Sequence, residues 1–342
     1  MSATTELPQL KKKDFTSDQE VRWCPGCGDY AILATMQGLL PKLGSRPEST
    51  VFVSGIGCSS RFPYYMDTYG IHSIHGRAPA IATGLAISRP DLDVWVITGD
   101  GDALSIGGNH LVHALRRNVD ITILLFNNEI YGLTKGQYSP TSPLGSVHKS
   151  TPMGSIDRPV NPVSLALGAE ATFVARTIDT DRNHLTEVLT AAHEHRGASF
   201  VEIYQNCVVF NDDAFTAITD REAKVINQIP LRQGEPIVFG PEGEHAVVAE
   251  QDGSMSIVST EAAGDRVVVH DAHRDEPTTA FALSRLSHNP TGPTPLGIFR
   301  DVDRPVYDEM LNDQITQARD ARGEGRLQDL LESGNVWDVT DE

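Results

Sequence analysis

One stretch of the chain, residues 94–137, constrains the fold more than any other. It reads VWVITGDGDALSIGGNHLVHALRRNVDITILLFNNEIYGLTKGQ. Residues 94–98 and 121–126 are apolar runs rich in β-branched side chains, which predict two strands, and the segment between them has helical character. Two strands joined by a helical crossover form a βαβ unit with parallel strands. We therefore expect an α/β fold with a mainly parallel sheet flanked by helices.

Polar residues follow both predicted strands directly. Asp100 and Asp102 alternate with Gly99 and Gly101 after the first strand, and Asn128 follows the second. Open α/β sheets bind ligands at the carboxyl ends of their strands, so these side chains should face one site. Carboxylate, amide and backbone oxygens suit Mg²⁺, while phosphate oxygens and water can complete its coordination. Glycine lets the backbone approach a phosphate closely, and the helix that begins after Asp102 can point its N-terminus at the same anion. The stretch therefore predicts a site for a metal-bridged diphosphate.

The composition excludes several classes of function. The chain carries 46 acidic and 28 basic residues, a formal net charge of −18. This charge argues against nonspecific binding to nucleic acid or to an anionic membrane surface. No apolar run is long enough to span a membrane, and the N-terminus lacks the basic, apolar, small-residue order of a signal peptide. We therefore expect a cytoplasmic protein without nucleic-acid or membrane partners.

The chain divides into three parts by pattern. Residues 1–22 form a polar N-terminal arm, and residues 23–230 carry alternating strand and helix patterns. Within this second part, residues 138–160 are rich in Ser, Thr, Pro and Gly and predict a long functional loop over the strand ends. Residues 231–342 contain short strands and helices without cysteine. They predict a small α+β C-terminal appendage with a structural or interface role.

Four cysteines, Cys24, Cys27, Cys58 and Cys207, are the only ones in the chain. A Cys-x-x-Cys pair in a cytosolic protein indicates metal binding or redox chemistry before a structural disulfide. Four thiolates suit a 4Fe–4S cluster, but they equally suit a structural zinc ion. The spacing departs from the compact run of bacterial ferredoxins, so spacing alone leaves both sites open.

Gly-Asp-Gly after one strand and Asn-Asn after the next resemble the motif of thiamine diphosphate enzymes. The resemblance sharpens when further motifs are added: WCPGCGDY, SGIGCSSR, HGRA, GDGDALSIGGNH, RRN and NNEIYGLTKGQ. Together they are similar to the β subunits of 2-oxoacid:ferredoxin oxidoreductases, over roughly residues 15–230. This resemblance implies a thiamine diphosphate-binding domain, with its iron–sulfur site, over residues 23–230.

The resemblance also implies a role for individual residues. The 4Fe–4S cluster would be held by Cys24, Cys27, Cys58 and Cys207, and Mg²⁺ by Asp100, Asn128 and the backbone oxygen of Ile130. Thiamine diphosphate would be lined by Ile56, Gly57, Cys58, Ser59, His75, Gly101, Asp102, Gly132 and Leu133, with His75 contacting its diphosphate or pyrimidine. Because Cys58 belongs to both sets, a cluster beside the cofactor could accept electrons, whereas zinc would be redox-inert. The resemblance therefore favours the cluster.

Lys135 is the residue that bears on the substrate. It follows the predicted metal-binding turn, where its ammonium could pair with the distal carboxylate of a dicarboxylic 2-oxoacid. The wording YGLTKGQ resembles the 2-oxoglutarate branch of the family. The reaction implied is CoA-dependent oxidative decarboxylation of 2-oxoglutarate to succinyl-CoA and CO2, with electrons passed to ferredoxin. A solvated surface lysine is the other interpretation of Lys135.

The resemblance implies a partner subunit as well. Thiamine enzymes use a glutamate at the aminopyrimidine, and no residue of this chain can be assigned to that role. The family supplies it from an α subunit, so we expect a heterodimer or an α2β2 assembly that is inactive without it. Three other interpretations remain: an enzyme for pyruvate or another 2-oxoacid, a nonoxidative thiamine diphosphate decarboxylase or ligase with a zinc or empty cysteine site, and a non-catalytic metal-binding scaffold.

Overall fold

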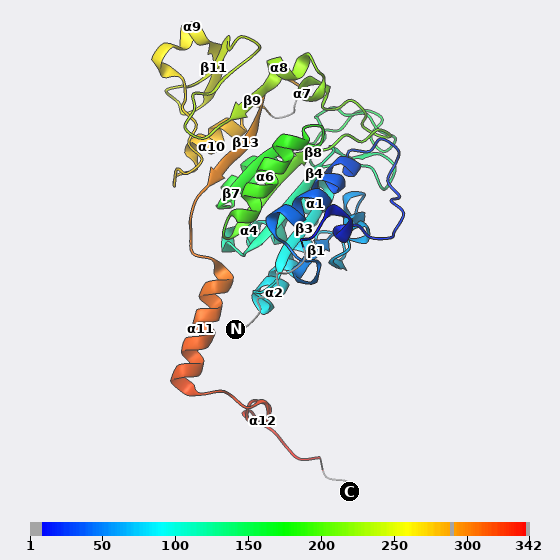
Figure 1. Cartoon of the computed structure of the whole chain (residues 1–342), viewed down its shortest axis with the longest axis vertical. Helices are drawn as coiled ribbons and strands as arrows, with labels where there is room; N and C mark the ends of the chain where they lie inside the picture. Colours follow the sequence, from blue (N-terminus) through cyan, green and yellow to red (C-terminus); the bar gives the residue numbers. More distant parts are fainter. Residues whose placement is uncertain (1–8, 288–290, 340–342) are drawn as a thin grey trace.

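The structure, a computed structural model, describes residues 9–287 and 291–339 (Figure 1). Its centre is an eight-stranded sheet with the order β2-β1-β3-β4-β8-β7-β13-β9. The strands are β1 (Thr50–Ser54), β2 (Tyr69–His72), β3 (Asp93–Gly99), β4 (Ile121–Asn127), β7 (Phe173–Ile178), β8 (Ala198–Tyr204), β9 (Gln228–Leu231) and β13 (Thr294–Asp301). Every pairing in this sheet is parallel except that of β13 with β7. The predicted α/β fold with a mainly parallel sheet is confirmed.

Helices cover both faces of the sheet. One face is packed by α1 (Asp29–Leu43) and α6 (Arg182–Glu194), which contact each other. The other face is packed by α2 (Ala78–Ser88), α4 (Gly108–Arg117), α5 (Pro162–Gly168) and α10 (Thr278–Ser284). A sheet covered on both sides explains why its central strands are apolar at almost every position rather than at alternate ones.

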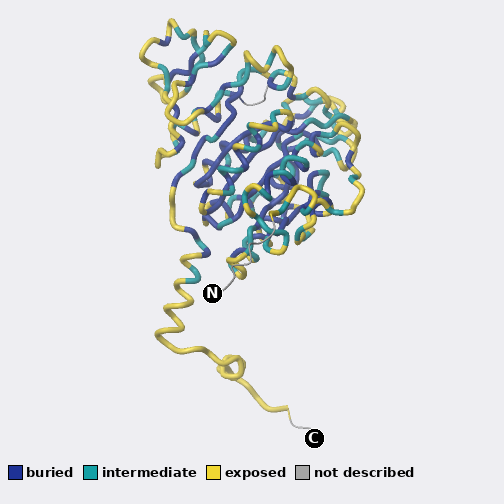
Figure 2. Tube along the Cα trace, in the orientation of Figure 1, coloured by how far each residue is buried: buried dark blue, intermediate teal, exposed yellow. Residues whose placement is uncertain are grey.

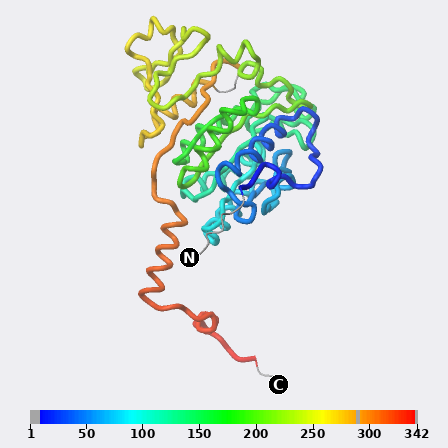
Figure 3. The backbone as a smooth tube through the Cα atoms, viewed as in Figure 1, coloured from blue at the N-terminus to red at the C-terminus, as the bar shows by residue number. Residues whose placement is uncertain are grey.

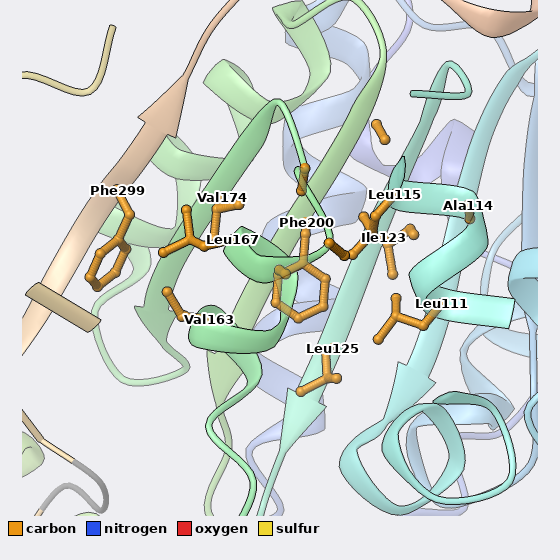
Figure 4. Close-up of a cluster of buried hydrophobic side chains, with 14 of the residues drawn as sticks. Leu111, Ala114, Leu115, Ile123, Leu125, Val163, Leu167, Val174, Phe200 and Phe299 are labelled. Atoms are coloured by element: carbon orange, nitrogen blue, oxygen red, sulfur yellow. The ribbon is translucent and has the colours of Figure 1, made fainter. Parts of the chain in front are cut away.

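Two hydrophobic clusters hold these layers together. Side chains alternate across a strand, so Val94 and Val96 join one cluster while Trp95 and Ile97 join the other. Figure 4 shows part of the first cluster, in which Phe200 of β8 lies among Ile123 and Leu125 of β4 and residues of α4 and α5. Strands β3 and β4 are thus buried on both faces, and the polar turns that follow them project from this buried centre.

The crossover between β3 and β4 differs from the single helix that the sequence predicts. A short helix, α3 (Asp100–Leu104), starts directly at the end of β3, and α4 begins only at Gly108. The interruption contains Gly107, where an added Cβ would lie 2.5 Å from the backbone oxygen of Asp102. Because Gly107 has no side chain, the backbone between α3 and α4 can pass close to that of Asp102. Asp100 lies in the first turn of α3 instead of ahead of the helix.

The chain after residue 230 is less separate than the sequence predicts. A three-stranded antiparallel sheet of β10 (Val238–Phe239), β11 (His245–Ala249) and β12 (Met255–Ser259) does form there. However, β13 returns to the main sheet between β7 and β9. Its sequence, TPLGIFRD, does not read as a strand, because Pro295 lacks an N–H and Gly297 has a φ of 130° beside a register shift. Residue 230 is thus not a boundary between two sheets.

The C-terminal segment leaves the body of the molecule (Figure 3). It contains α11 (Tyr307–Arg322) and α12 (Leu327–Leu331), and both are exposed along most of their length (Figure 2). Asp308 is the one buried residue of α11, where its carboxylate accepts a hydrogen bond from the backbone N–H of Asp120 at 3.0 Å. Across residues 9–287 and 291–339, no helix has the length and apolar character that a membrane crossing needs.

Asn118 anchors this segment to the sheet. It ends α4 in a left-handed conformation (φ 56°) and is buried. Its Oδ1 accepts hydrogen bonds from Thr172 Oγ1 at 2.6 Å and Ala198 N at 2.9 Å, while its Nδ2 donates to Pro305 O at 3.2 Å. One side chain therefore joins the starts of β7 and β8 to the segment that precedes α11.

We expect Asn118→Ala to lower the free energy of unfolding by about 3 kcal/mol, because it leaves buried backbone and hydroxyl groups unpaired. The measurement is the urea midpoint of the purified protein. Asn118→Gly is the matched control, since it relieves the left-handed backbone and loses the same hydrogen bonds. A loss below about 1 kcal/mol in both variants contradicts the anchoring role.

Candidate active site at the carboxyl edge of the sheet

One cavity lies where the turns after β1, β3 and β4 meet Gln205, which follows β8. All the residues that the sequence predicts around thiamine diphosphate line it: Ile56, Gly57, Cys58, Ser59, His75, Gly101, Asp102, Gly132 and Leu133. The three predicted Mg²⁺ ligands, Asp100, Asn128 and Ile130, line the same cavity. The fold therefore brings these residues together from four separate segments of the chain. We refer to this hollow as the cofactor cavity.

Asp102 is buried and ties the turns of the cofactor cavity to one another. Its Oδ1 accepts hydrogen bonds from the backbone N–H of Ile56 at 3.1 Å and of Gly76 at 2.7 Å. Its Oδ2 accepts a third from Thr98 Oγ1 at 2.8 Å. Because protein donors occupy both oxygens, Asp102 shapes the cavity by holding the turn after β1 and the turn that carries His75.

Gly101 is required by packing as well as by any approach of a phosphate. A Cβ at this position would lie 2.1 Å from the ring of Tyr131. The Tyr131 hydroxyl donates a hydrogen bond to Gly101 O at 3.2 Å. The aromatic ring thus closes one side of the cavity against the first turn of α3.

Asp100 is a buried carboxylate whose hydrogen-bonding side-chain partners are two neutral hydroxyls. Ser139 Oγ lies 2.5 Å and Thr141 Oγ1 lies 2.6 Å from its Oδ2. Burial raises the pKa of Asp100 to about 6, and the two hydroxyls offset part of this rise. An ionised carboxylate in such a place gains from a nearby cation, so the donor set fits a divalent metal. Ser139 and Thr141 belong to the long loop after β6 (Gln137–Tyr138), and no sequence motif singles them out.

A chain of buried polar groups continues from Thr141 across the sheet. The Thr141 hydroxyl, which has one proton, also lies 2.9 Å from Asn127 Oδ1. Asn127 Nδ2 donates to Glu202 Oε1 at 2.7 Å, and Glu202 Oε2 pairs with Arg176 Nε at 2.7 Å. Both members of this ion pair are fully buried, so it is kept only because each charge is matched. The orientation of Thr141 therefore depends on a charge pair in the middle of β7 and β8.

Asn128 and Gln205 connect the cofactor cavity with the cysteines. Asn128 Nδ2 donates to Gln205 Oε1 at 3.1 Å, and Gln205 Nε2 in turn donates to Cys27 Sγ at 3.3 Å. Asn128 Oδ1 accepts a hydrogen bond from the backbone N–H of Ile130 at 3.2 Å, which folds the turn after β4. Sequence reasoning missed Gln205, because a single glutamine after a strand carries no pattern.

The four cysteines line a second hollow of about 320 Å³, which we call the cysteine cavity. Cys24 is exposed, and Cys27, Cys58 and Cys207 are half-buried. Over the described ranges 9–287 and 291–339, no three Cys, His, Asp or Glu side chains form a group that could hold one metal ion. The two cavities share a wall of Cys58, Asn128, Gly132, Leu133 and Gln205. Whatever the cysteine cavity holds therefore lies beside the cofactor cavity.

Asp29 is a further buried carboxylate next to the cysteines. Neither of its oxygens has a hydrogen-bonding partner among nitrogen and oxygen atoms, and burial raises its pKa to about 7. Burial likewise raises the pKa of the Cys27 and Cys58 thiols. The protein environment alone thus favours protonated thiols here, and a bound metal would have to displace those protons.

His75 and Lys135 lie at different cavities. His75 is exposed and lines the cofactor cavity, as the sequence predicts. Lys135 is also exposed, has a φ of 76°, and lines the cysteine cavity instead. It is joined to the cofactor cavity only through the shared wall at Gly132 and Leu133.

Another hollow, of about 600 Å³, lies at the edge of the sheet opposite to the cofactor cavity. It is lined by Glu194, His195 and Arg196, which immediately precede β8, and by Asp301 at the end of β13. This is the amino edge of the parallel strands, whereas ligands of open α/β sheets bind at the carboxyl edge. We therefore place the candidate active site at the cofactor cavity.

Comparison with known proteins agrees with this placement. The family profile described as thiamine pyrophosphate enzyme, C-terminal TPP binding domain, matches residues 55–203. The chain is 63% identical over 338 residues to the 2-oxoglutarate oxidoreductase subunit KorB of Mycobacterium tuberculosis, which covers 98% of this chain and 90% of the relative. It is 43% identical over 249 residues to the 2-oxoacid:ferredoxin oxidoreductase 1, subunit beta, of Aeropyrum pernix, covering 72% of this chain and 76% of the relative.

A solved structure supports the same relationship. It is the 2-oxoglutarate:ferredoxin oxidoreductase from Magnetococcus marinus with 2-oxoglutarate, coenzyme A and succinyl-CoA bound. Its chain is 33% identical in sequence and superposes with a TM-score of 0.74. The match covers 96% of this chain and 97% of that one. The cavity at the strand ends, the thiamine pyrophosphate profile and the whole-chain relatives together show that this chain belongs to the family of 2-oxoacid:ferredoxin oxidoreductase β subunits.

Proposed function

We propose that the chain is the β subunit of a 2-oxoglutarate:ferredoxin oxidoreductase. The reaction is the CoA-dependent oxidative decarboxylation of 2-oxoglutarate to succinyl-CoA and CO2, with electrons passed to ferredoxin. The observation that carries the proposal is the wall shared by the cofactor cavity and the cysteine cavity. The name of the 63% identical relative and the ligands of the solved structure favour 2-oxoglutarate over pyruvate or another 2-oxoacid.

Thiamine diphosphate, when bound, supplies an electron sink for the loss of CO2 from a 2-oxoacid. Asp100, Asn128 and the Ile130 carbonyl would hold Mg²⁺ against its diphosphate, because they are the oxygen donors that line the cofactor cavity. Ser139 and Thr141 orient the Asp100 carboxylate by hydrogen bonds. Asp102 holds the turns of Ile56 and Gly76 in place, and the His75 side chain would contact the diphosphate or the pyrimidine.

A 4Fe–4S cluster, when bound, supplies a one-electron acceptor. Cys24, Cys27, Cys58 and Cys207 would hold it, since all four line one hollow beside the cofactor cavity. Gln205 would fix the position of the Mg²⁺ site relative to the cluster site, because it is hydrogen-bonded to Asn128 on one side and to Cys27 on the other. A zinc or empty site, as in a nonoxidative decarboxylase, is the second candidate that experiment must separate from this one.

The proposal includes a partner. The β-subunit names of the relatives imply a second subunit of the same enzyme, and we infer that this α subunit supplies the acid that activates the aminopyrimidine. The working unit would be a heterodimer or an α2β2 assembly.

The central test is anaerobic co-purification with the α subunit. We expect a brown complex with iron and sulfide that reduces methyl viologen when 2-oxoglutarate and CoA are both present. Cys207→Ser should lose the visible absorption of the cluster and this reduction, whereas the exposed-surface control Ser88→Ala should keep both. The chain without its α subunit should be inactive. A colourless wild-type complex that still decarboxylates 2-oxoglutarate would establish the nonoxidative alternative.

The loop hydroxyl beside Asp100 gives a second test. We expect Thr141→Val to weaken Mg²⁺ binding about tenfold or more, because loss of a partner that orients a metal ligand has an effect of this size. Affinity is read from Mg²⁺ titration of the complex in the presence of thiamine diphosphate, and independently from Mn²⁺ electron paramagnetic resonance. Thr151→Val is the matched control, because Thr151 lies in the same loop and its hydroxyl donates to Ser146 O instead of to Asp100. Equal affinities in the two variants contradict the orienting role.

Lys135 tests the substrate assignment. If its ammonium pairs with the distal carboxylate of 2-oxoglutarate, Lys135→Ala should raise the KM for 2-oxoglutarate about tenfold or more, in keeping with the loss of one charge-assisted hydrogen bond. Activity with pyruvate, which lacks that carboxylate, should change little, and Lys135→Arg should retain part of the preference. Equal losses on both substrates reject the pairing.

A further inference from the structure

The mouth of the cysteine cavity is positively charged in a chain that is otherwise strongly acidic. Arg22, Arg61 and Lys135 are among its lining residues, and none of the residues that line it is acidic. The chain as a whole carries a net charge of −18. A cluster of cations on such a protein creates a local field opposite in sign to that of the remaining surface.

Arg22 and Arg61 also border an adjoining hollow of about 340 Å³, together with Gln19, Glu20, Tyr64 and Tyr65. Glu20 is the only acidic group on its lining, and its ion pair with Arg22 is exposed, with 73% and 68% of the two side chains accessible. Exposed pairs of this kind are weak, so Arg22 remains available to another anion. The two arginines therefore stand between the cysteines and an open, concave surface.

The backbone that carries Arg22 is held firmly in place. Its N–H donates to Tyr65 Oη at 2.9 Å, and its carbonyl accepts a hydrogen bond from Arg61 Nη1 at 3.2 Å. The next residue, Trp23, is buried and donates from its indole to Cys58 O at 2.7 Å. The backbone at Arg22 and the guanidinium of Arg61 thus have a defined position beside the cysteines, while the Arg22 side chain extends into solvent.

The surface beside these cations is apolar and exposed. Leu133, Val209 and Phe210 line the cysteine cavity and are 45%, 54% and 37% accessible. Cys24, the one exposed cysteine, lies two residues from Arg22. A redox centre bound by the cysteines would therefore be closest to solvent where the cations and the apolar side chains surround it.

We propose that this rim, Arg22 and Arg61 with Leu133, Val209 and Phe210, is the docking surface for a small acidic electron-carrier protein. The inference rests on the proposed function, since it requires a cluster in the cysteine cavity. Acidic groups of the carrier pair with the two arginines, and the acidic remainder of the chain repels other approaches, so the carrier is oriented as it arrives.

The number of electrons released in each turnover agrees with a small, charged docking surface. Oxidation of one 2-oxoacid to its acyl-CoA and CO2 releases two electrons, and each oxidised one-electron carrier accepts one of them. Two carriers must therefore dock and leave in each turnover. Small, charged contacts of under about 1,200 Å² suit such short-lived electron-transfer encounters.

The test uses the co-purified complex and an oxidised acidic ferredoxin as the probe. We expect R22E/R61E to raise the Kd for this ferredoxin about tenfold or more at low ionic strength, and to make log Kd depend less steeply on salt. The KM for ferredoxin should rise in parallel. Reduction of methyl viologen, a small dye that needs no docking surface, should fall much less than reduction of ferredoxin.

Arg116→Glu is the matched control, because Arg116 is an exposed arginine on α4 at the amino edge of the sheet. This variant should bind ferredoxin like the wild type. An unchanged Kd in R22E/R61E overturns the proposal, as does a rise in the KM for CoA with ferredoxin binding intact. Failure of R22E/R61E to assemble with the α subunit on gel filtration also overturns it, because the rim would then be a subunit interface. A wild-type complex without dye reduction instead indicates failure of the proposed function.

Discussion

The interaction on which the candidate site most depends is the buried ion pair of Arg176 and Glu202 in the middle of the sheet. Removing one partner of a charge pair that is buried away from water leaves an uncompensated charge and is strongly destabilising. Glu202 also accepts a hydrogen bond from Asn127, which in turn lies beside the hydroxyl of Thr141. The geometry of the loop over Asp100 is therefore coupled to the interior of the sheet. This coupling explains how a long loop without regular structure can hold a buried carboxylate in one orientation.

The second constraint is that two sites share one wall. Turns after β1 and β4 each contribute to both cavities: Cys58 comes from the first, and Asn128, Gly132 and Leu133 come from the second. Gly132 marks how closely they approach, because a Cβ there would lie 3.6 Å from the sulfur atoms of both Cys58 and Cys207. A larger residue would enter the space between the cysteines. At Gly132 the turn thus separates the cofactor cavity from the cysteines by backbone alone, while the neighbouring Leu133 lines both cavities.

The sequence was most informative where function is carried by local pattern. Strands β1, β3 and β4 are short apolar runs that end in glycine, asparagine or polar residues, so both the strands and the residues after them could be predicted. Ser139, Thr141, Gln205 and Glu202 could not be predicted, because they reach the site through strand pairing and through a loop of irregular backbone. The same applies to β13, whose proline and glycine disguise a strand that only its pairing with β7 and β9 defines. Lys135 shows a further limit: its position in the chain was clear, but which of two adjoining cavities it would line depended on the turn at Gly132 and Leu133.

The two adjoining cavities differ in their exposure to solvent. The cofactor cavity is bounded by buried groups such as Asp100 and Asp102, whereas the cysteine cavity opens to solvent at Cys24. Chemistry on a 2-oxoacid requires exclusion of water, but delivery of electrons to a protein requires that a redox centre lie near the surface. Because the two cavities share a wall that includes Cys58 and Gln205, the fold can satisfy both requirements at adjacent positions. The cations that line the cysteine cavity would serve the proposed docking, since an acidic chain without them would repel an acidic carrier.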